Sequence, residues 1–251
     1  MVTSAASGAE NMALDEALME RACLTGEWVL RVYSWLSPTI SLGRSQVAKG
    51  QYDLTAIESR HIGVVRRLTG GRAILHDREI TYSVTAPAHT AGSLAESYDR
   101  INALLMTGLE AIGVRASVSS GLGRAPRPGI SPCFEEPVAG ELTVDGRKLA
   151  GSAQFRNGGA MLQHGSILVD DDQCLLSELT RGGGTPRVAP ATLSETLGRA
   201  PEYSEVADAL AHAVRKLEDP QAAALVADEA LRARASVLVV RYLDDDWTWR
   251  R

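Results

Sequence analysis

One stretch of the chain, RRLTGGRAILHD, concentrates side chains that can do chemistry. It begins at Arg66 and places two adjacent glycines between basic residues and a histidine. Because glycine has no Cβ, Gly70 and Gly71 would let the backbone approach a ligand closely, and Arg66, Arg72 and His76 could meet its polar atoms. The stretch is not a P-loop, since it has no Gly-Lys-Ser/Thr and no helix is predicted after the glycines. The residues alone leave open a tight turn with solvated arginines.

A second stretch, DGRKLAGSAQ, carries Lys148 on a predicted strand. Strict alternation would put on one face Lys148, Ala150, Ser152 and Gln154. Beside the lysine, Gly151 and Ala153 leave room for a chain-like ligand, so Lys148 could lie along the floor of a pocket. A solvated lysine on an edge strand is the more common outcome for this residue type and stays open here.

Three cysteines and a strand histidine complete the set of reactive side chains. Cys133 lies in SPCFEEP, within a segment rich in glycine and proline, and the residues alone leave open a nucleophile or a small apolar side chain. Cys23 and Cys174 lie in helical stretches and are expected to be core hydrophobes. His164, followed by Gly165 in LQHGSIL, is either a site residue or a satisfied core histidine.

Length and composition limit the classes of protein to consider. The chain has 251 residues, 45% hydrophobic and 23% charged, which is ordinary for a globular protein. A net charge of −5 without a dense basic stripe gives no reason to expect nucleic acid as a partner. No apolar run reaches the length of a membrane span and no secretory signal opens the chain. The odd, widely spaced cysteines do not form a disulfide framework, so a reducing, cytoplasmic setting and no membrane contact are expected.

The periodicity predicts strands in hairpins with helices between them at irregular intervals. Helices are expected at residues 11–22, 53–60, 93–113, 173–180, 204–219 and 221–235. Strands are expected at residues 28–35, 39–43, 63–68, 72–76, 79–86, 114–120 and 160–170, and a hairpin of two strands at residues 140–151. No linker or repeat interrupts this order, which predicts one α+β domain over residues 1–251, with mixed, largely antiparallel sheets flanked by helices.

Local signals fix some boundaries of these elements. Asn11 is a candidate N-cap for the first helix, and the segment before it, MVTSAASGAE, is expected to be a loose arm. Asp15 lies in the first turns of that helix, where the helix dipole favours negative charge. Gly113 suits a Schellman-type helix end, and Asp145-Gly146 suits a type I′ turn between two strands.

The ordered set of motifs resembles a known family. RRLTGGRAILHD, GRKLAGSAQ and LQHGSIL, together with NMALDEAL and DDDWTWRR, are similar to the catalytic domain shared by lipoate–protein ligases and octanoyltransferases. The resemblance runs from about Asn11 to the C-terminus. It implies a fold like that of the biotin/lipoate-protein ligase catalytic domain. In that fold the double-glycine loop and the lysine strand enclose a tunnel for a medium-length acyl chain.

Within that family, SPCFEEP ahead of VDGRKLAG resembles the cysteine-dependent octanoyltransferases. The resemblance implies Cys133 as the nucleophile that accepts octanoate from octanoyl–acyl carrier protein, with Lys148 stabilising the thiolate. The acceptor would be a lysine of a lipoyl-domain protein, the glycine-cleavage H protein or a dehydrogenase E2 subunit. The reaction would need no cofactor and no metal, and the protein is expected to be a monomer. The residues expected to bind substrate are Arg66, Gly70, Gly71, Arg72, His76, Gly151, Ser152, Ala153, His164 and Gly165.

Two other functions fit the same motifs. An ATP-dependent lipoate–protein ligase would adenylate free lipoate with ATP and Mg²⁺, and would tolerate the loss of Cys133. A non-catalytic acyl-binding protein would keep the pocket without turnover. Two-step covalent transfer, in contrast, requires an activated nucleophile. Cys133 is therefore the residue that separates the transferase from the ligase.

Overall fold

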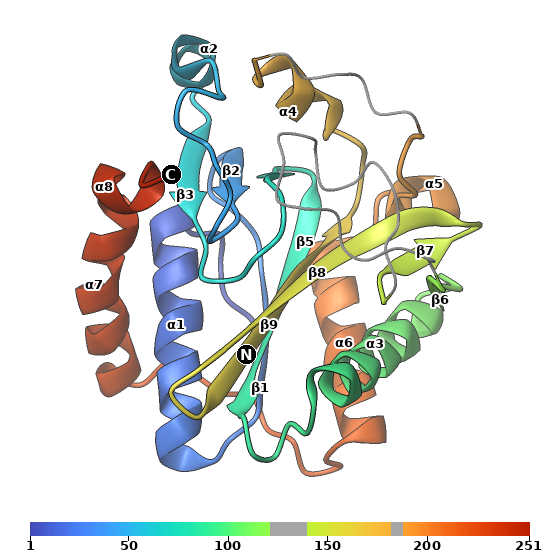
Figure 1. Ribbon diagram of the computed structural model, residues 1–251. Coiled ribbons are helices and arrows are strands. Elements are labelled where there is room, and N and C mark those ends of the chain that lie inside the picture. Colours follow the sequence, from blue (N-terminus) through green and yellow to red (C-terminus); the bar gives the residue numbers. More distant parts are fainter. Residues whose placement is uncertain (121–139, 182–187) are drawn as a thin grey trace.

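A computed structural model describes residues 1–120, 140–181 and 188–251 (Figure 1). Within these residues the strands form a larger sheet in the order β1-β5-β9-β8-β7-β6 and a smaller sheet in the order β3-β2-β4. All pairs are antiparallel except β2 with β3. The strands are β1 (Val29–Tyr33), β2 (Thr39–Leu42), β3 (Gly63–Arg66), β4 (Ile74–His76), β5 (Glu79–Pro87), β6 (Ser117–Val118), β7 (Leu142–Val144), β8 (Arg147–Asn157) and β9 (Ala160–Leu168). The expected α+β class with largely antiparallel sheets is confirmed.

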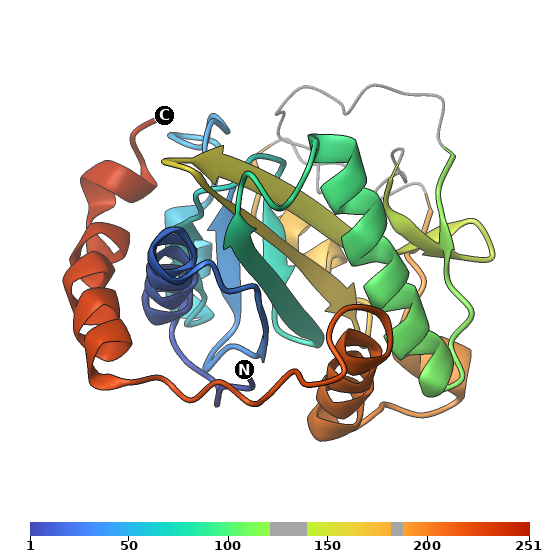
Figure 2. The same cartoon turned by 90° about the horizontal axis from the view of Figure 1, so that it is seen from below.

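Helices cover both faces of the larger sheet (Figure 2). The helices are α1 (Gly8–Thr25), α2 (Leu54–Ser59), α3 (Leu94–Ala111), α4 (Cys174–Glu178), α5 (Leu193–Leu197), α6 (Tyr203–Leu217), α7 (Glu229–Leu243) and α8 (Asp245–Thr248). α3 and α6 pack on one face, where β5 contributes Tyr82 and Val84 to the core. α1, backed by α7, lies on the other face, which receives Tyr33 of β1. In the described part of the chain, none of the helices is long and apolar enough to cross a membrane.

The alternation of β5 explains how the two faces differ. Its even-numbered residues from Ile80 to Ala86 are apolar and buried under α3 and α6. Its odd-numbered residues are polar and point toward α1, where Ser83 donates to Asp15. A strand buried on both faces therefore carries an apolar core on one side and a polar layer on the other. That polar layer is where the candidate site lies.

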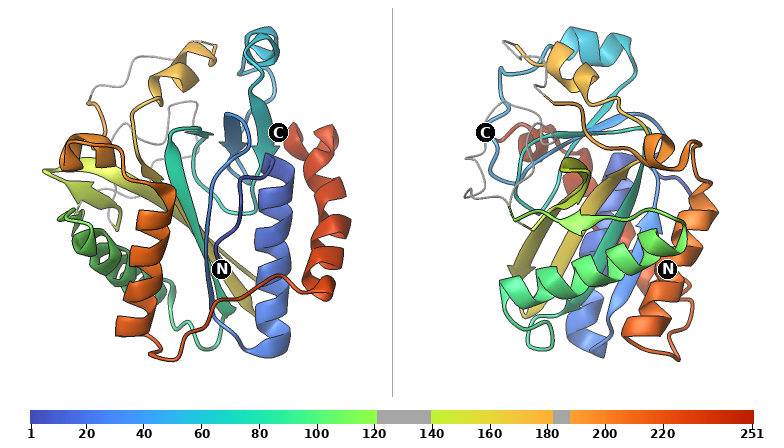
Figure 3. Two further views of the ribbon diagram at one scale, coloured as in Figure 1. Left: turned by 180° about the vertical axis from the view of Figure 1, so that it is seen from behind. Right: turned by 90° about the vertical axis from the view of Figure 1, so that its right-hand side faces the viewer.

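The start of the first helix differs from the expectation. Ser7, not Asn11, is the N-cap, and it forms a capping box with Glu10. Asn11 is instead buried, and its amide donates to the carbonyls of Ala6 and Ser34. The opening segment is not a loose arm either, because its backbone bonds to β1 and the following residues at Val2, Thr3 and Ala6 (Figure 3, left).

Short-range signals further along the chain agree with the structure, with one exception. Gly113 has φ of +93°, and its N–H and that of Val114 bond to the carbonyls of Glu110 and Leu109, which is the expected Schellman end. The φ values of +49° and +75° at Asp145 and Gly146 fit the predicted type I′ turn. The expected helix at 221–235 was wrong at its start, because α7 begins only at Glu229, after the N-cap Asp228.

Candidate functional site

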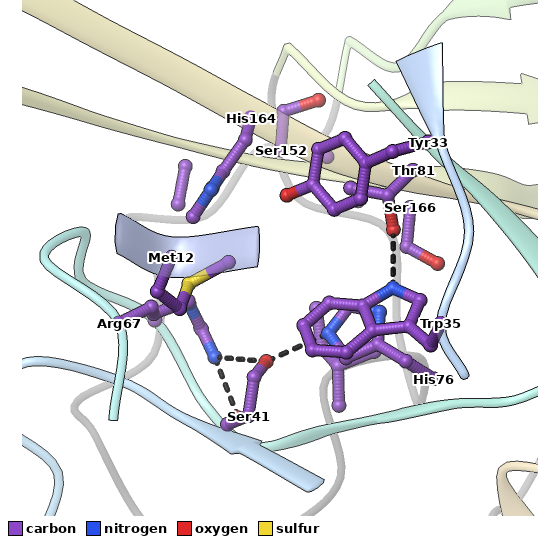
Figure 4. A pocket seen from close by; sticks show the side chains of 15 residues that line it. Met12, Tyr33, Trp35, Ser41, Arg67, His76, Thr81, Ser152, His164 and Ser166 are labelled. Atoms are coloured by element: carbon purple, nitrogen blue, oxygen red, sulfur yellow. Dashed lines mark hydrogen bonds between the residues drawn. The ribbon is translucent and has the colours of Figure 1, made fainter. Parts of the chain in front are cut away.

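A small pocket lies between α1, β1, the smaller sheet and strands β8 and β9 (Figure 4). Figure 4 shows His164 and Tyr33 on one side of it and Arg67, Ser41 and His76 on the other. Its lining residues are Met12, Tyr33, Trp35, Ser41, Arg67, Gly71, Ile74, His76, Thr81, Gly151, Ser152, Ala153, His164, Gly165 and Ser166. The structure thus brings together residues of the double-glycine loop and of both strands singled out from the sequence.

Close packing requires glycine at position 165 of β9. A Cβ built on Gly165 would lie 2.6 Å from the Gly151 carbonyl oxygen and 2.7 Å from the Tyr82 ring. Neither the β8 backbone nor the buried ring can move away easily, so no side chain fits at Gly165. Tyr82 lies on the α3 side of the sheet, so Gly165 lines the pocket with its backbone alone. On the pocket face, Gly151 and Ala153 of β8 present nothing larger than a methyl group.

The double-glycine loop is wrapped around the guanidinium of Arg67. Nη2 of Arg67 donates to the carbonyls of Gly70 and Arg72, both at 2.8 Å. Nη1 donates to the backbone and hydroxyl oxygens of Ser41 at 2.7 and 3.0 Å. Gly71 has φ of +93°, and a Cβ on it would lie 2.9 Å from Nη2 of Arg67. Arg67 therefore fixes the loop that closes one side of the pocket.

Three residues expected to bind substrate do not line this pocket. Arg66 is fully buried on the other side of the small sheet, where it donates to the backbone carbonyls of Gly43, Gln46 and Thr248. Burial, and then the nearby arginines, lower the pKa of Arg66 to about 10. Gly70 and Arg72 contribute carbonyls to Arg67 and are absent from the lining. Adjacent strand residues point to opposite sides, so the pocket receives Arg67 and not Arg66.

His164 joins the pocket to the buried carboxylate of Asp15. Its Nδ1 lies 3.4 Å from Asp15 Oδ2, and its Nε2 lies 2.6 Å from the hydroxyl of Thr69. Burial lowers the pKa of His164 despite the neighbouring carboxylate, so the ring is neutral at pH 7. Thr69 accepts a bond from Arg67, and we therefore assign its hydroxyl proton to His164 Nε2 and the ring proton to Nδ1.

Asp15 is the centre of the polar layer between α1 and the larger sheet. Arg31 donates to it at 2.7 Å, Tyr33 at 2.9 Å and Ser83 at 2.7 Å. Burial alone would raise the pKa of Asp15, but Arg31 and the hydrogen bonds of His164 and Ser83 lower it below 3.8. The carboxylate is therefore charged, and its role is not the favourable helix-dipole contact expected from its position in the helix.

His76 lies at the far side of the pocket from His164. Its ring stacks on Trp35 with centroids 4.1 Å apart, and its Nε2 lies 2.8 Å from the hydroxyl of Ser41. Its Nδ1 lies 3.3 Å from the buried carboxylate of Glu79. Trp35 in turn donates to Thr81 at 2.9 Å. The aromatic and polar groups are thus held firmly by one another at this end of the cavity.

Lys148 is buried, with a side chain only 2% exposed, and its ammonium lies 2.5 Å from Glu141. The alternative of a solvated lysine is therefore excluded. The predicted alternation was also wrong here, because Thr143 pairs with Lys148 whereas Leu142 pairs with Ala150. Leu149 is an extra residue, a β-bulge, and it reverses the faces. The register places Lys148 on the face of Gly151 and Ala153, which is the pocket face, but Lys148 itself does not line the pocket.

The cysteines differ from the expectations in part. Cys133, the predicted nucleophile, lies outside the described residues. Cys23 and Cys174 are both exposed, so the prediction that they are core hydrophobes was wrong. Cys23 lies on the outward face at the end of α1, where its thiol donates to the Gly158 carbonyl at 3.0 Å. Helical periodicity alone did not distinguish this outward face from the buried one.

Several residues of the site were missed by reasoning from the sequence. Asp15, which bonds to the lining residues Tyr33 and His164, carried a usable signal, because helical spacing places it beside Met12 and Met19 on the buried face of α1. A carboxylate in such a stripe calls for a partner. Tyr33, Trp35 and Ser41 carried no signal, since nothing local distinguishes them from ordinary strand residues.

Comparison with known proteins agrees with this geometry. Residues 7–215 match the Lipoyl protein ligase A/B catalytic domain family. Octanoyltransferase LipM of Exiguobacterium sp. is 39% identical over 267 residues, covering 99% of this chain and 96% of that protein. Octanoyltransferase LipM of Moorella thermoacetica is 37% identical, covering 96% and 93%.

Solved structures show the same fold. The structure of lipoate-protein ligase A bound with ATP covers 99% of this chain and 96% of its own, with a TM-score of 0.80 at 22% identity. A T. acidophilum protein with bound lipoic acid covers 99% and 98%, with a TM-score of 0.82 at 20% identity. Identities this low show the fold alone. By its sequence match and by its relatives, the chain belongs to the lipoyl protein ligase A/B catalytic domain family.

Proposed function

We propose that this protein is an octanoyltransferase of protein lipoylation, acting as one catalytic domain over residues 1–251. It moves octanoate from octanoyl–acyl carrier protein to a lysine of a lipoyl-domain protein, the glycine-cleavage H protein or an E2 subunit. Support comes from relatives named octanoyltransferase that match almost the whole chain. A monomer in the cytoplasm, without nucleic acid or membrane as a partner, suits this function.

The single observation that carries the proposal is the lining of the pocket, which includes residues of the strand that carries Lys148. On that strand the pocket face presents Gly151 and Ala153, where side chains are small or absent. Its walls include Met12, Trp35 and Ile74, which offer apolar surface to a hydrocarbon chain. The neutral His164 adds no charge. An unbranched acyl chain fits this lining, and the ammonium of Lys148 lies on the same face of β8.

The reaction proceeds in two balanced steps. The Cys133 thiol gives up its proton, its thiolate attacks the octanoyl thioester, the carrier's C–S bond breaks, and the departing carrier sulfur takes up one proton. The acceptor lysine, as the free amine, then attacks the Cys133 thioester; the Cys133 C–S bond breaks, an amide forms, and the proton lost by the amine returns the Cys133 sulfur to a thiol. Lys148 favours the thiolate and the oxyanion by its positive charge. Exchange of one thioester for another needs no ATP and no metal.

Backbone amides of β8 are candidates for stabilising the oxyanion. β7 pairs with β8 only as far as Ala150. From Gly151 onward, no strand of the described chain covers that edge of β8. Within Gly151 to Ala153, the Ser152 backbone faces this edge, where its carbonyl accepts from Tyr98 at 3.4 Å, so the Ser152 N–H is the amide placed to donate to a developing oxyanion. Ser152 itself bonds to Tyr82 through its hydroxyl at 2.7 Å, which leaves its backbone as the contributing part.

The decisive experiment is intact-mass analysis after incubation with octanoyl–acyl carrier protein. Wild type should gain one octanoyl group that hydroxylamine removes. Cys133→Ser should gain no octanoyl group that hydroxylamine removes. Transfer to a lipoyl-domain acceptor should follow without ATP. If lipoate is attached only with ATP, and Cys133→Ala retains that activity, the protein is a ligase. If neither donor gives a product, it is a non-catalytic acyl-binding protein.

A further inference from the structure

The buried carboxylate of Glu141, the residue just before β7, faces Lys148 on β8. Glu141 Oε1 lies 2.5 Å from Lys148 Nζ, and the two side chains are 8% and 2% exposed. Transferring a single charge of this kind from water into the protein is costly unless a counter-charge accompanies it. A pair buried this deeply therefore implies that each group holds the other in one place.

Glu141 is itself held by backbone contacts on both sides. Its carbonyl accepts from the Ser119 N–H at 2.8 Å, and the Gly140 N–H donates to the Ser119 carbonyl at 3.1 Å. Asn102 of α3 donates to the Gly140 carbonyl at 2.8 Å. Gly140 has φ of +88°, a conformation that glycine adopts without strain. The carboxylate is thus anchored to α3 and β6 before it meets Lys148.

The bulge in β8 determines on which face of the sheet Lys148 and Glu141 meet. Without Leu149 as the extra residue, Lys148 would lie on the α3 side of the sheet, with Ala150 in the core. With the bulge, Lys148 shares the face of Thr143 and Gly151, and Glu141 lies on the same face because it alternates with Leu142. The carboxylate and the ammonium therefore meet on the pocket side of the hairpin.

We propose that Glu141 is a positioning residue: its carboxylate holds the Lys148 ammonium at the pocket face of β8, where that charge acts on the acyl group. This inference rests on the proposed function for the reaction that is assayed. Glu141 acts through Lys148, so its loss should lower kcat and leave donor binding in the pocket unchanged.

The test measures kcat and KM for transfer from octanoyl–acyl carrier protein to a lipoyl-domain acceptor. Glu141→Gln should lower kcat about 10- to 100-fold with KM within about twofold of wild type. Glu141→Asp keeps the charge but shortens the side chain by one methylene, and should recover part of kcat. Unfolding midpoints are measured for each variant, because a structural role alone would not split kcat from KM or respond to the conservative replacement.

The matched control is Glu195→Gln. Glu195 pairs with Arg147, next to Lys148 on the same strand, but its side chain is 54% exposed. This variant should retain wild-type kcat and KM. A wild-type kcat in Glu141→Gln, or equal losses in the folded Asp and Gln variants, would overturn the inference. If Glu141→Gln does not fold, Glu141→Asp decides: a lowered kcat at unchanged KM supports the role, and a wild-type kcat refutes it.

The two proposals fail in distinguishable ways. Wild-type protein that transfers no octanoyl group refutes the proposed function. Wild-type transfer with an unaffected Glu141→Gln variant refutes only the role of Glu141.

Discussion

Two buried ion pairs flank the pocket, and they differ in what they connect. Asp15 and Arg31 meet at 2.7 Å, and Asp15 also bonds to side chains of β5 and β9. This pair therefore ties α1 to three strands of the larger sheet. Lys148 and Glu141 meet at 2.5 Å across only seven positions of sequence, within the β7–β8 hairpin.

The difference indicates separate roles for similar chemistry. The Asp15 carboxylate joins its own helix to three strands, so its loss would loosen the packing of α1 on the larger sheet. The Glu141–Lys148 pair lies within one hairpin, so its loss would leave that packing intact and change only the position of the Lys148 ammonium. We therefore expect substitutions at Asp15 to act on folding and substitutions at Lys148 to act on catalysis.

The largest effect is expected for Asp15→Asn. The amide keeps the size of the side chain but leaves Arg31, only 1% exposed, without its counter-charge. Breaking one partner of a buried pair typically costs about 3–5 kcal/mol of stability. Urea unfolding followed by tryptophan fluorescence measures the loss. A change below about 1 kcal/mol would show that Asp15 does not hold the layers together.

A smaller loss of stability is expected for Lys148→Met. The buried carboxylate of Glu141 would lose its charged partner, at a cost of roughly 1–3 kcal/mol. The double variant Glu141→Gln/Lys148→Met removes both charges and should regain most of that stability, since an uncharged pair of similar volume is tolerated. Octanoyl transfer should stay lost in both. A double variant that is no more stable than Lys148→Met would contradict this.

The elements that sequence predicts well are those decided within a few residues. The turn at Asp145-Gly146 and the helix end at Gly113 both depend on a local φ above zero, and both were predicted. The fold class followed from the order of such elements. Asn11 failed as an N-cap because Ser7 and Glu10, inside the segment expected to be a loose arm, form a capping box.

Sequence motifs identified several residues that line the pocket, but they did not show which residues contact one another there. Gly71, His76 and His164 were expected and do line the pocket. The partner of His164, Thr69, is 95 positions away in the sequence, and spacing cannot show such a contact. One extra residue, Leu149, was enough to reverse the predicted face of Lys148. Bulges are set by strand pairing, which a single sequence does not display.

His164→Gln should change the pH dependence of stability. The folded pKa of His164 lies below 6.5, chiefly because of burial. The unfolded chain therefore binds more protons below pH 6.5, so wild type loses this part of its stability as the pH falls and keeps it above that value. Glutamine does not titrate, so the loss of unfolding free energy from pH 8 to pH 5.5 should be smaller in the variant. An unchanged loss would show that His164 is protonated in the folded protein.

Asp15, whose pKa is lowered below 3.8, contributes to the pH dependence of stability only at more acidic pH.

The smallest effect is expected for Arg234→Ala, which breaks an ion pair between α7 and α1. Arg234 lies 2.6 Å from Glu20, but the side chains are 45% and 41% exposed. Exposed pairs contribute about 0–1 kcal/mol, and salt screens them further. Urea unfolding at low and at high salt should show a small difference that shrinks as salt is added. Glu20 of this pair lies on the same helix as Asp15. If Arg234→Ala destabilises the protein as much as Asp15→Asn does, then burial does not explain why the Asp15 pair contributes more stability, and the argument from desolvation fails.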